Sequence, residues 1–315
     1  MSLPKVGVVT VTYNSVGVLD EFLRCLWAQK GVELHLYVID NNSEDGTVSR
    51  LRDDASAESM TVIANTSNEG VAVGNNQGTE AAIADANTWV LLLNNDTVFD
   101  DTFVADLVAN AMKHDSKILS PVIETTEPPG SVWYSDGRIQ PFKAMKATHL
   151  GMGTRIPAEL PENYGVDYAS TCALLVAPTV FEEVGLMDPV YFVYGDDVDF
   201  CIRARKHGYE YRVAGNVLLT HKASSLTGDY TGPFAVRWIS RNWIVVARRH
   251  ATPIQLIVGL AYVSMWTVAR FALRRDSLSV TRRRLKAFAE GWRLDLASKP
   301  PSLASGSLSS RAGGK

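Results

Sequence analysis

Short apolar runs rich in β-branched residues alternate with helix-like segments over the first hundred residues. The runs cover residues 6–12, 34–39, 60–64 and 88–93. Such alternation is typical of a parallel sheet whose strands are joined by crossover helices. We therefore expect an α/β fold with a mostly parallel central sheet, in which ligands bind beyond the carboxyl ends of the strands.

Charge divides the chain into an acidic part and a basic part. Residues 237–315 contain fifteen Lys and Arg but three Asp and Glu, a net charge of +12, so residues 1–236 carry −15 within the total of −3. We expect a catalytic domain over 1–236, a basic, partly apolar helical extension over 237–298 and a disordered tail over 299–315. Because no recognisable nucleic-acid-binding module accompanies the basic part, we expect no nucleic-acid partner.

Three cysteines, Cys25, Cys172 and Cys201, form an odd number at unrelated spacings. This argues against a disulfide framework, and we expect core residues in a reducing compartment. Residues 1–5 lead directly into an apolar stretch, without a basic leader and cleavage site. The expected location is cytoplasmic.

Two strand ends carry candidate metal ligands. Asn94-Asn95-Asp96 follows the run that ends at Leu93, and His221 follows the run 217–219. A carboxylate so placed can hold a hard divalent cation, Mg²⁺ or Mn²⁺, that bridges to diphosphate oxygens, and imidazole is a common metal ligand. A turn is the alternative interpretation of residues 94–96, since Asn and Asp favour turns.

Three acidic residues, Asp196, Asp197 and Asp199, occur within four positions at the start of a predicted helix. Capping of the helix is one interpretation, but three carboxylates exceed what capping requires. One of them can accept the proton of an attacking hydroxyl. We predict that Asp197 is this base and that Asp199 pairs with Arg203 one helical turn later.

Polar residues also follow the first two predicted strands. A nucleotide needs an apolar or aromatic face for its base, a carboxylate or amide for the base edge, and close backbone approach at its phosphates. Tyr13 and Asp40 fit the base. The predicted nucleotide-binding residues are Thr12, Tyr13, Asn14, Asp40, Asn42, Asn68, Gly70, Asn75 and Asn95.

Five motifs occur along the chain in the same order as in a known family. They are VTYN (11–14), IDNNSEDGT (39–47), NEGVAVGNNQG (68–78), LLLNNDT (91–97) and YGDDVDFCIR (194–203). Together they resemble the inverting family 2 glycosyltransferases, most of all the rhamnosyltransferase branch, over residues 5–245. The resemblance implies a nucleotide-sugar-binding fold of the A type, a base contact at Asp40 and a cation-binding triplet at 94–96.

The resemblance also assigns catalytic roles. It implies that Asp197 is the base, that Asp196 stands where glutamate is usual, and that His221 completes the metal site, as a histidine does in galactofuranose-transferring relatives. Asn94 replaces the usual aspartate, so it would offer a neutral amide oxygen or no ligand, and the donor diphosphate would supply much of the cation's binding. Arg241-Asn242 resembles a pair found in rhamnosyl-type members. The implied reaction is a single displacement with inversion, in which the cation site stabilises the departing diphosphate.

The predicted function is transfer of rhamnose from dTDP-rhamnose to a hydroxyl of a glycan or a polyprenyl-diphosphate-linked acceptor, in surface-polysaccharide or cell-wall synthesis. Two alternatives remain: transfer of galactofuranose or N-acetylglucosamine from a UDP donor, and a non-catalytic nucleotide-sugar-binding protein. A nucleotidyltransferase would show a Gly-rich basic loop near the N-terminus, and residues 11–19 contain no Lys or Arg.

Residues 254–269 form a largely apolar run flanked by arginines. The run is short for a membrane span, which needs about 20 apolar residues. It predicts either a helix that packs on the catalytic domain or on a second subunit, or a helix at a membrane surface. In the second case residues 248–286 would contact anionic head groups or a polyprenyl diphosphate, peripherally at the inner face of the cell membrane.

Overall fold

The computed structural model describes residues 2–54, 56–222 and 232–303, and its centre is one ten-stranded sheet. The strands of this sheet are β1 (Lys5–Thr12), β2 (Glu33–Asp40), β3 (Met60–Ala64), β4 (Trp89–Leu93), β5 (Thr97–Val98), β6 (Ile118–Thr125), β7 (Ser131–Tyr134), β10 (Asn163–Val166), β11 (Ala173–Val176) and β12 (Tyr211–His221). They run in the order β10-β12-β6-β11-β4-β1-β2-β3, with β5 paired to β12 and β7 to β6.

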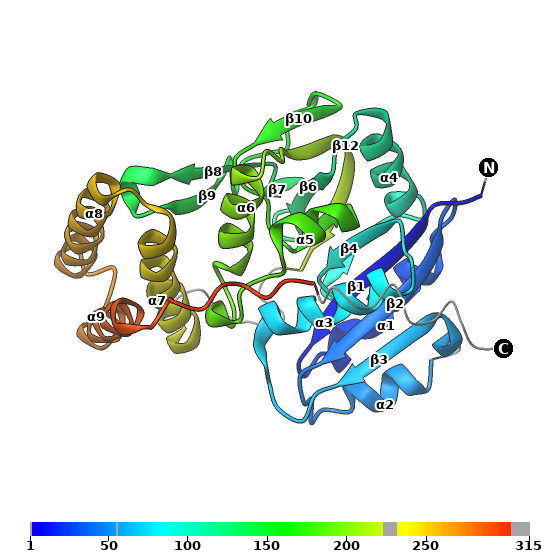
Figure 1. The fold of residues 1–315 in the computed structure, drawn as a ribbon, viewed down its shortest axis with the longest axis horizontal. Helices are drawn as coiled ribbons and strands as arrows, with labels where there is room; N and C mark the ends of the chain where they lie inside the picture. Colours follow the sequence, from blue (N-terminus) through cyan, green and yellow to red (C-terminus); the bar gives the residue numbers. More distant parts are fainter. Residues whose placement is uncertain (1, 55, 223–231, 304–315) are drawn as a thin grey trace.

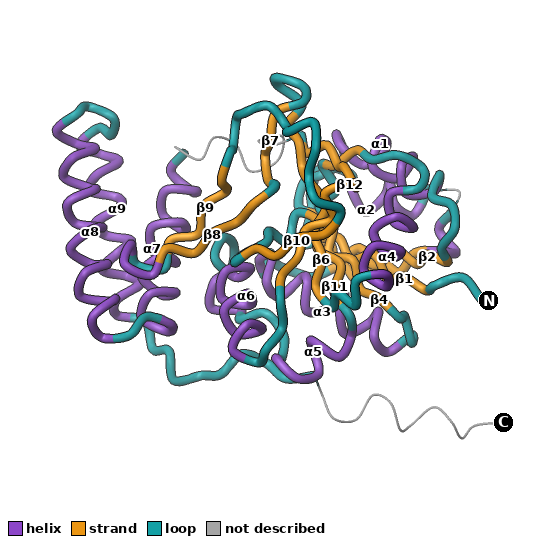
Figure 2. The backbone as a smooth tube through the Cα atoms, turned by 90° about the horizontal axis from the view of Figure 1, so that it is seen from above, coloured by secondary structure: helices purple, strands orange, loops and turns teal. Residues whose placement is uncertain are grey.

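Six of these strands, β1, β2, β3, β4, β6 and β12, point in one direction. β11 lies antiparallel between β4 and β6. The expected α/β fold with a mostly parallel central sheet is therefore confirmed, and Figures 1 and 2 show its helices on both sides of the sheet. The helices of the catalytic part are α1 (Val16–Trp27), α2 (Thr47–Arg52), α3 (Gly70–Ala84), α4 (Phe103–Lys113), α5 (Pro178–Val184) and α6 (Asp196–Lys206), with 3-10 turns η1 (Ala57–Ser59) and η3 (Pro189–Tyr191).

Helix α3 packs closely on β1. A Cβ atom at Gly78 would lie 2.3 Å from a Val9 methyl carbon, and one at Gly74 would lie 2.7 Å from a Val11 methyl carbon. These separations are shorter than any real carbon contact, so the two glycines are needed for helix–strand packing. Their place in the motif at 68–78 thus has a structural cause.

The segment 120–164, which the sequence predicts to be irregular, contains several short strands. Besides β7 and β10 it holds an antiparallel ribbon of β8 (Asp136–Gln140) and β9 (Lys146–Leu150), joined by the turn η2 (Pro141–Lys143). Each strand has four or five residues, too few for a clear period-two pattern beside the prolines and glycines. The ribbon reaches from the sheet to the C-terminal helices (Figure 1).

Three helices follow the catalytic part: α7 (Pro233–His250), α8 (Pro253–Ala272) and α9 (Leu278–Arg293). The expected boundary between 236 and 237 falls inside α7, because Pro233 starts the helix at its first position. In the first part of the predicted tail, the Leu186 N–H donates to the Pro301 carbonyl over 2.8 Å, and Leu303 packs on the main core. Residues 304–315 lie outside the described ranges.

The main hydrophobic core surrounds the sheet and includes all three cysteines. Their predicted core positions are confirmed, since each is a buried free thiol.

Candidate active site

The pairing of β5 with β12 brings two predicted metal ligands together. His221, the last residue of β12, pairs with Thr97 of β5. Asp96 directly precedes Thr97 in the sequence. The His221 Nε2 atom lies 3.2 Å from the Asp96 Oδ1 atom, and each side chain is 8% exposed. Two segments 125 positions apart in sequence numbering thus form one buried acid–imidazole pair.

The surroundings of this pair favour a charged imidazole. Burial lowers the pKa of His221, but Cys172 and Asp96 outweigh burial and raise it to about 10. Burial raises the pKa of the Cys172 thiol, so we attribute the raised pKa of His221 chiefly to the Asp96 carboxylate. A cation on Nε2 requires the neutral imidazole, so its binding would release this proton.

The donor set fits a cation that is only partly coordinated by protein. Within the described ranges, no three His, Cys, Asp or Glu residues form a cluster that could hold a metal ion. Asn94 is exposed, whereas the buried Asn95 donates from Nδ2 to the Val11 carbonyl over 2.9 Å. Asp96 and His221 would therefore supply two ligands and leave the others to diphosphate oxygens and water.

The predicted base-binding residues lie at the ends of β1 and β2. Asp40 is buried and accepts hydrogen bonds from the Thr12 hydroxyl, over 2.9 Å, and from the backbone N–H and hydroxyl of Ser43. Tyr13 is 50% exposed beside them. The Asp40 carboxylate thus fixes the loop that would face a nucleotide base.

Two predicted asparagines shape these loops through their backbones. Asn14 and Asn42 have φ angles of 52° and 64°, in the left-handed region that Asn tolerates better than most residues. The Asn14 Oδ1 atom also accepts from the Glu44 N–H over 2.9 Å. The β1 and β2 loops are therefore held together as one unit.

Three further predicted nucleotide-binding residues lie at the start of α3. The Asn68 Oδ1 atom accepts from the Gly70 N–H over 3.0 Å, and Gly70 packs against the Phe192 backbone. The buried Asn75 amide faces the Met187 sulfur at 3.7 Å. These residues connect α3 to the segment that leads into the acidic cluster.

Asp197 lies at the start of α6 with one side-chain partner. The Tyr168 hydroxyl donates to its Oδ2 atom over 2.6 Å. Burial raises the pKa of Asp197, and the hydrogen bond from Tyr168 offsets part of this. Burial and the adjacent carboxylate raise the pKa of Tyr168 well above its usual value, so the phenol remains a donor.

Asp196 is almost fully buried, at 3% exposure. Burial, followed by repulsion from Asp197, raises its pKa to about 8. At neutral pH the proton of this pair therefore resides mainly on Asp196, which leaves Asp197 as the ionised member.

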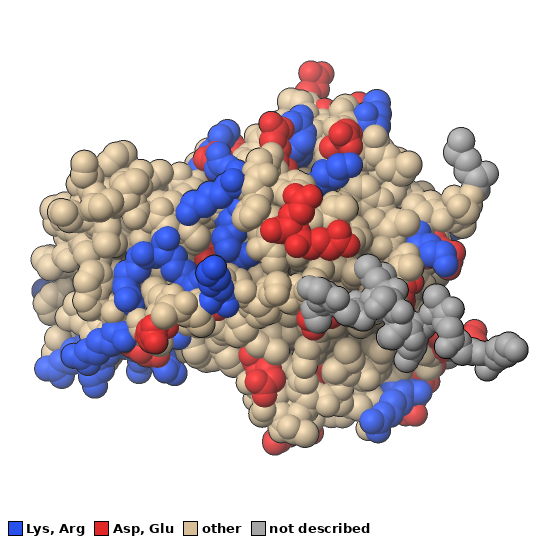
Figure 3. All heavy atoms as spheres, viewed as in Figure 1, with Lys and Arg blue, Asp and Glu red and all other residues tan. Residues whose placement is uncertain are grey.

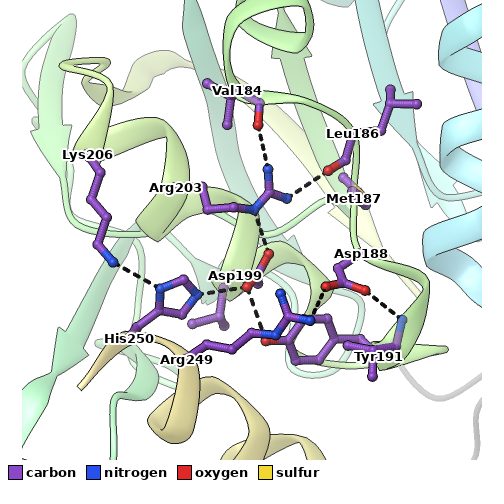
Figure 4. A network of polar contacts seen from close by, with 12 residues as sticks. Val184, Leu186, Met187, Asp188, Tyr191, Asp199, Arg203, Lys206, Arg249 and His250 are labelled. Atoms are coloured by element: carbon purple, nitrogen blue, oxygen red, sulfur yellow. Dashed lines mark hydrogen bonds and ion pairs between the residues drawn. The ribbon is translucent and has the colours of Figure 1, made fainter. Parts of the chain in front are cut away.

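Asp199 lies on the opposite side of the same helical turn, at the centre of the polar network in Figure 4. Its carboxylate accepts from the Arg203 Nε atom over 2.7 Å, from the Tyr191 hydroxyl over 3.1 Å and contacts His250 Nε2 at 2.7 Å. The predicted pairing of Asp199 with Arg203 is confirmed.

An aromatic wall formed by Trp133, His149 and Tyr168 joins the two candidate centres. Trp133 packs edge-on against His221 at a centroid distance of 4.6 Å and against His149 at 4.8 Å, and His149 stacks on Tyr168 at 5.8 Å. Sequence reasoning missed all three residues. For Trp133 and His149 the only signal is the concentration of aromatic residues and histidine in the segment predicted to be irregular, and Tyr168 follows that segment.

The Arg241-Asn242 pair holds the segment before the acidic cluster. The Asn242 side-chain amide donates to the carbonyls of Tyr191, Val193 and Tyr194 over 2.7–2.8 Å, and Arg241 donates to the Val190 carbonyl over 2.8 Å. This pair therefore fixes the approach to α6 without itself being part of the acidic cluster.

Comparison with known proteins adds a family to this geometry. The model of "Glycosyl transferase family 2" matches residues 7–179, more than half of the chain. The chain belongs to glycosyl transferase family 2. The matched region contains Asp40 and Asp96 and ends before the acidic cluster at 196–199.

Curated relatives in the family have related names. The chain is 27% identical over 317 residues to N-acetylglucosaminyl-diphospho-decaprenol L-rhamnosyltransferase of Mycobacterium tuberculosis, covering 90% of this chain and 97% of that protein. It is 21% identical to dTDP-rhamnosyl transferase RfbF of Shigella flexneri, with 90% and 94% coverage. It is 24% identical to the low-salt glycan biosynthesis hexosyltransferase Agl10 of Haloferax volcanii, with 65% of this chain and 62% of that protein aligned.

Solved structures share the fold. GalNAc-T7 with UDP, GalNAc and Mn²⁺ superposes with a TM-score of 0.64 at 16% identity, over 78% of this chain and 48% of that one. The mannosyltransferase PcManGT from Pyrobaculum calidifontis, with GDP-Man and Mn²⁺, gives 0.57 at 16% identity, over 93% and 88%. These likenesses establish the A-type glycosyltransferase fold.

Proposed function

We propose that this chain is an inverting glycosyltransferase that transfers rhamnose from dTDP-rhamnose to a hydroxyl of a lipid-linked or glycan acceptor. The observation that carries the proposal is the pairing of two centres across one aromatic wall. On one side lie Asp96 and His221, suited to a cation and diphosphate. On the other lies Asp197, suited to accept a proton. The names of two relatives support rhamnose as the transferred sugar.

In this proposal Asp197 accepts the proton of the acceptor hydroxyl while the oxygen of that hydroxyl forms a bond to the anomeric carbon. The bond from that carbon to the diphosphate oxygen breaks, and the nucleoside diphosphate departs from the opposite face. Tyr168 keeps the Asp197 carboxylate oriented through its 2.6 Å hydrogen bond. Because one displacement suffices, no covalent sugar intermediate forms and the configuration inverts.

A divalent cation, Mg²⁺ or Mn²⁺, fits the pair of Asp96 and His221. When bound, it would neutralise charge that develops on the departing diphosphate. The two protein ligands lie in a buried site at the strand ends, where charge interactions are stronger than in water.

A donor panel tests this function. We expect dTDP-rhamnose to raise the melting temperature and to be hydrolysed slowly in the presence of Mn²⁺, more than UDP-galactofuranose or UDP-N-acetylglucosamine. Preference for a UDP sugar would replace the donor assignment. Stabilisation by a donor without turnover by any acceptor would favour a non-catalytic binding protein.

The cation assignment has its own test. We expect His221→Ala to raise the Mn²⁺ concentration for half-maximal hydrolysis at least tenfold, because one of two protein ligands is lost. His114→Ala, at an exposed residue after α4, is the matched control. An unchanged Mn²⁺ requirement in His221→Ala would contradict the site.

We further propose that α8 and α9 lie on an anionic membrane surface. α8 is long and apolar enough to cross a membrane by length and composition. Only 17% of its most apolar window is buried inside the protein, so most of this window is not covered by other elements. Its outward residues include Ile254, Ile257, Met265 and Val268, each at least 66% exposed. This apolar face carries no acidic residue.

The outward face of α9 combines apolar and basic residues. Leu278, Leu285 and Trp292 repeat every seven positions and are about half exposed. Arg282, Lys286 and Arg293 are exposed beside them in helical order. Lys and Arg side chains gather at this end of the molecule in Figure 3. An apolar stripe with Trp beside cations is typical of a helix at a membrane surface.

Vesicle flotation tests the membrane contact. We expect binding to vesicles that contain phosphatidylglycerol but not to pure phosphatidylcholine, and loss of binding in Ile257→Lys. The control Met112→Lys changes a 67% exposed residue on α4 and should bind as the wild type does. Dimerisation that Ile257→Lys abolishes, without vesicle binding, would assign the face to a second copy of the chain.

A further inference from the structure

A pocket of about 300 Å³ lies between the β8–β9 ribbon, the start of α6 and helices α7 to α9. Its apolar lining comes mainly from Met145, Val198, Val236, Ile239, Trp243 and Trp266. The volume is at the lower end of the range for small-molecule sites. The two tryptophans meet edge to face at 5.5 Å, so the wall between α7 and α8 is aromatic.

The pocket borders the candidate catalytic base on one side. Tyr194 and Gly195 line it, and they directly precede Asp196 and Asp197 in the sequence. The backbone of Gly195 lies against the side chains of Asn242 and Val246 in α7. A molecule in the pocket would therefore end beside the start of α6.

The opposite side of the pocket borders the apolar helix. Trp266 of α8 lines the pocket, and Met265 and Val268 on the same helix are exposed. The pocket and the surface proposed to contact lipid thus share helix α8.

Two cations line the pocket but differ in their partners. Arg284 is held by an ion pair with Asp276 at 2.9 Å and lies over the Trp266 ring. Lys146 lies 5.8 Å from the Trp243 ring, and among the described residues no ion pair holds its ammonium group. Burial, with the nearby charges of Lys143 and Arg270, lowers the pKa of Lys146. An anionic group beside Lys146 would stabilise the charged ammonium group and so offset the effects of burial and of the nearby positive charges on its pKa.

We propose that this pocket binds the first isoprenoid units of a polyprenyl-diphosphate-linked acceptor, with Lys146 beside the diphosphate. The inference rests on the proposed function and deepens it by naming the acceptor class. The apolar lining suits a hydrocarbon chain better than a free glycan, which would leave its hydroxyls without partners. The predicted nucleotide-binding residues lie elsewhere, after β1, β2 and β4 and at the start of α3.

Binding of farnesyl diphosphate, below its micelle concentration, tests the pocket by calorimetry. We expect farnesyl diphosphate to bind at least tenfold more tightly than inorganic diphosphate. Ile239→Trp fills the pocket and should remove this difference. Phe234→Trp is the matched control, because it changes an exposed residue of the same helix outside the pocket. Equal affinities for the two ligands in the wild type would overturn the proposal.

Lys146→Ala tests the head-group contact. We expect it to weaken farnesyl diphosphate binding three- to tenfold while leaving farnesol binding unchanged. The control Lys143→Ala removes an exposed lysine three positions away that does not line the pocket. An equal effect of both variants would show a general charge effect and contradict the contact.

Photo-crosslinking of the wild-type protein needs no variant. A benzophenone analogue of farnesyl diphosphate should label peptides from α7 or α8. Labelling elsewhere would overturn the pocket assignment even if Ile239→Trp failed to fold.

Kinetics separate this inference from the proposed function. If the wild type transfers sugar equally well to acceptors with and without a prenyl chain, the glycosyltransferase function stands and the pocket assignment fails. If no nucleotide sugar is hydrolysed or transferred while farnesyl diphosphate still binds, the proposed function fails alone.

Discussion

The two sides of the first turn of α6 hold carboxylates with opposite properties. Asp199 is fully buried among Arg203, His250 and Tyr191; burial raises its pKa, but His250 and Arg203 outweigh burial and hold it below its usual range. Asp197, two residues away, has Tyr168 as its side-chain partner, and burial holds its pKa above the usual range. When two neighbouring carboxylates have environments that shift their pKa values in opposite directions, the two groups are suited to different roles. The comparison gives Asp199 a structural role and supports the proposal that Asp197 is the base.

The largest effect is expected for Asp197→Asn. We expect kcat to fall roughly 100- to 10,000-fold, because an amide cannot accept the hydroxyl proton. Donor affinity and melting temperature should change little. Asp53→Asn, at an exposed surface carboxylate, is the control for loss of charge. A variant that transfers sugar at the wild-type rate would remove Asp197 from the mechanism.

Asp199→Asn should act in the opposite way, mainly on stability. Loss of one partner from a buried ion pair leaves Arg203 poorly compensated and costs about 3–5 kcal/mol. Since the pKa of Asp199 is lowered on folding, its contribution is present above its unfolded pKa and is lost as pH falls through the folded value. Urea unfolding at neutral pH measures the loss, and an unfolding free energy equal to that of the wild type would contradict the network's structural role.

Asp196→Asn sharpens the comparison through pH. The pKa of Asp196 rises to about 8 in the folded protein, from an unfolded value of about 3.9. The wild type should therefore lose stability as pH rises through this window, by more than about 1 kcal/mol between pH 5 and pH 8. Asn cannot ionise, so the variant should lack this loss. Parallel pH profiles of the two proteins would show that Asp196 ionises freely.

The same comparison shows what could be predicted from sequence. Strand ends place Asp96 and His221, and helical spacing pairs Asp199 with Arg203, because these signals are local. Trp133 and His149 could not be found in this way. They meet the site through strands of four or five residues, whose pairing depends on partners far along the chain.

The C-terminal helices illustrate a second limit. An apolar run predicts a helix, but its periodicity does not say which side is covered. Only the packed structure shows that Gly259, Val263 and Thr267 face inward and that Ile254 and Met265 do not. The pocket beside Trp266 likewise arises from five separate segments.

The smallest effect is expected for Tyr168→Phe. Loss of the hydrogen bond to the ionised carboxylate should raise the pKa of Asp197 further. Because the base must be ionised, the acidic limb of the kcat profile should move to higher pH by about one unit. Rates well above this limb should be close to the wild type. A fall in rate with no shift of the limb would indicate a structural role alone.

The stereochemistry of donor hydrolysis tests the central claim most directly. NMR can record the anomer of rhamnose released from dTDP-rhamnose before the free sugar equilibrates. A single displacement with Asp197 as base predicts that the first-released sugar has the configuration opposite to that of the donor. Release with the donor's configuration would contradict the account, because it requires two displacements or attack from the leaving-group side.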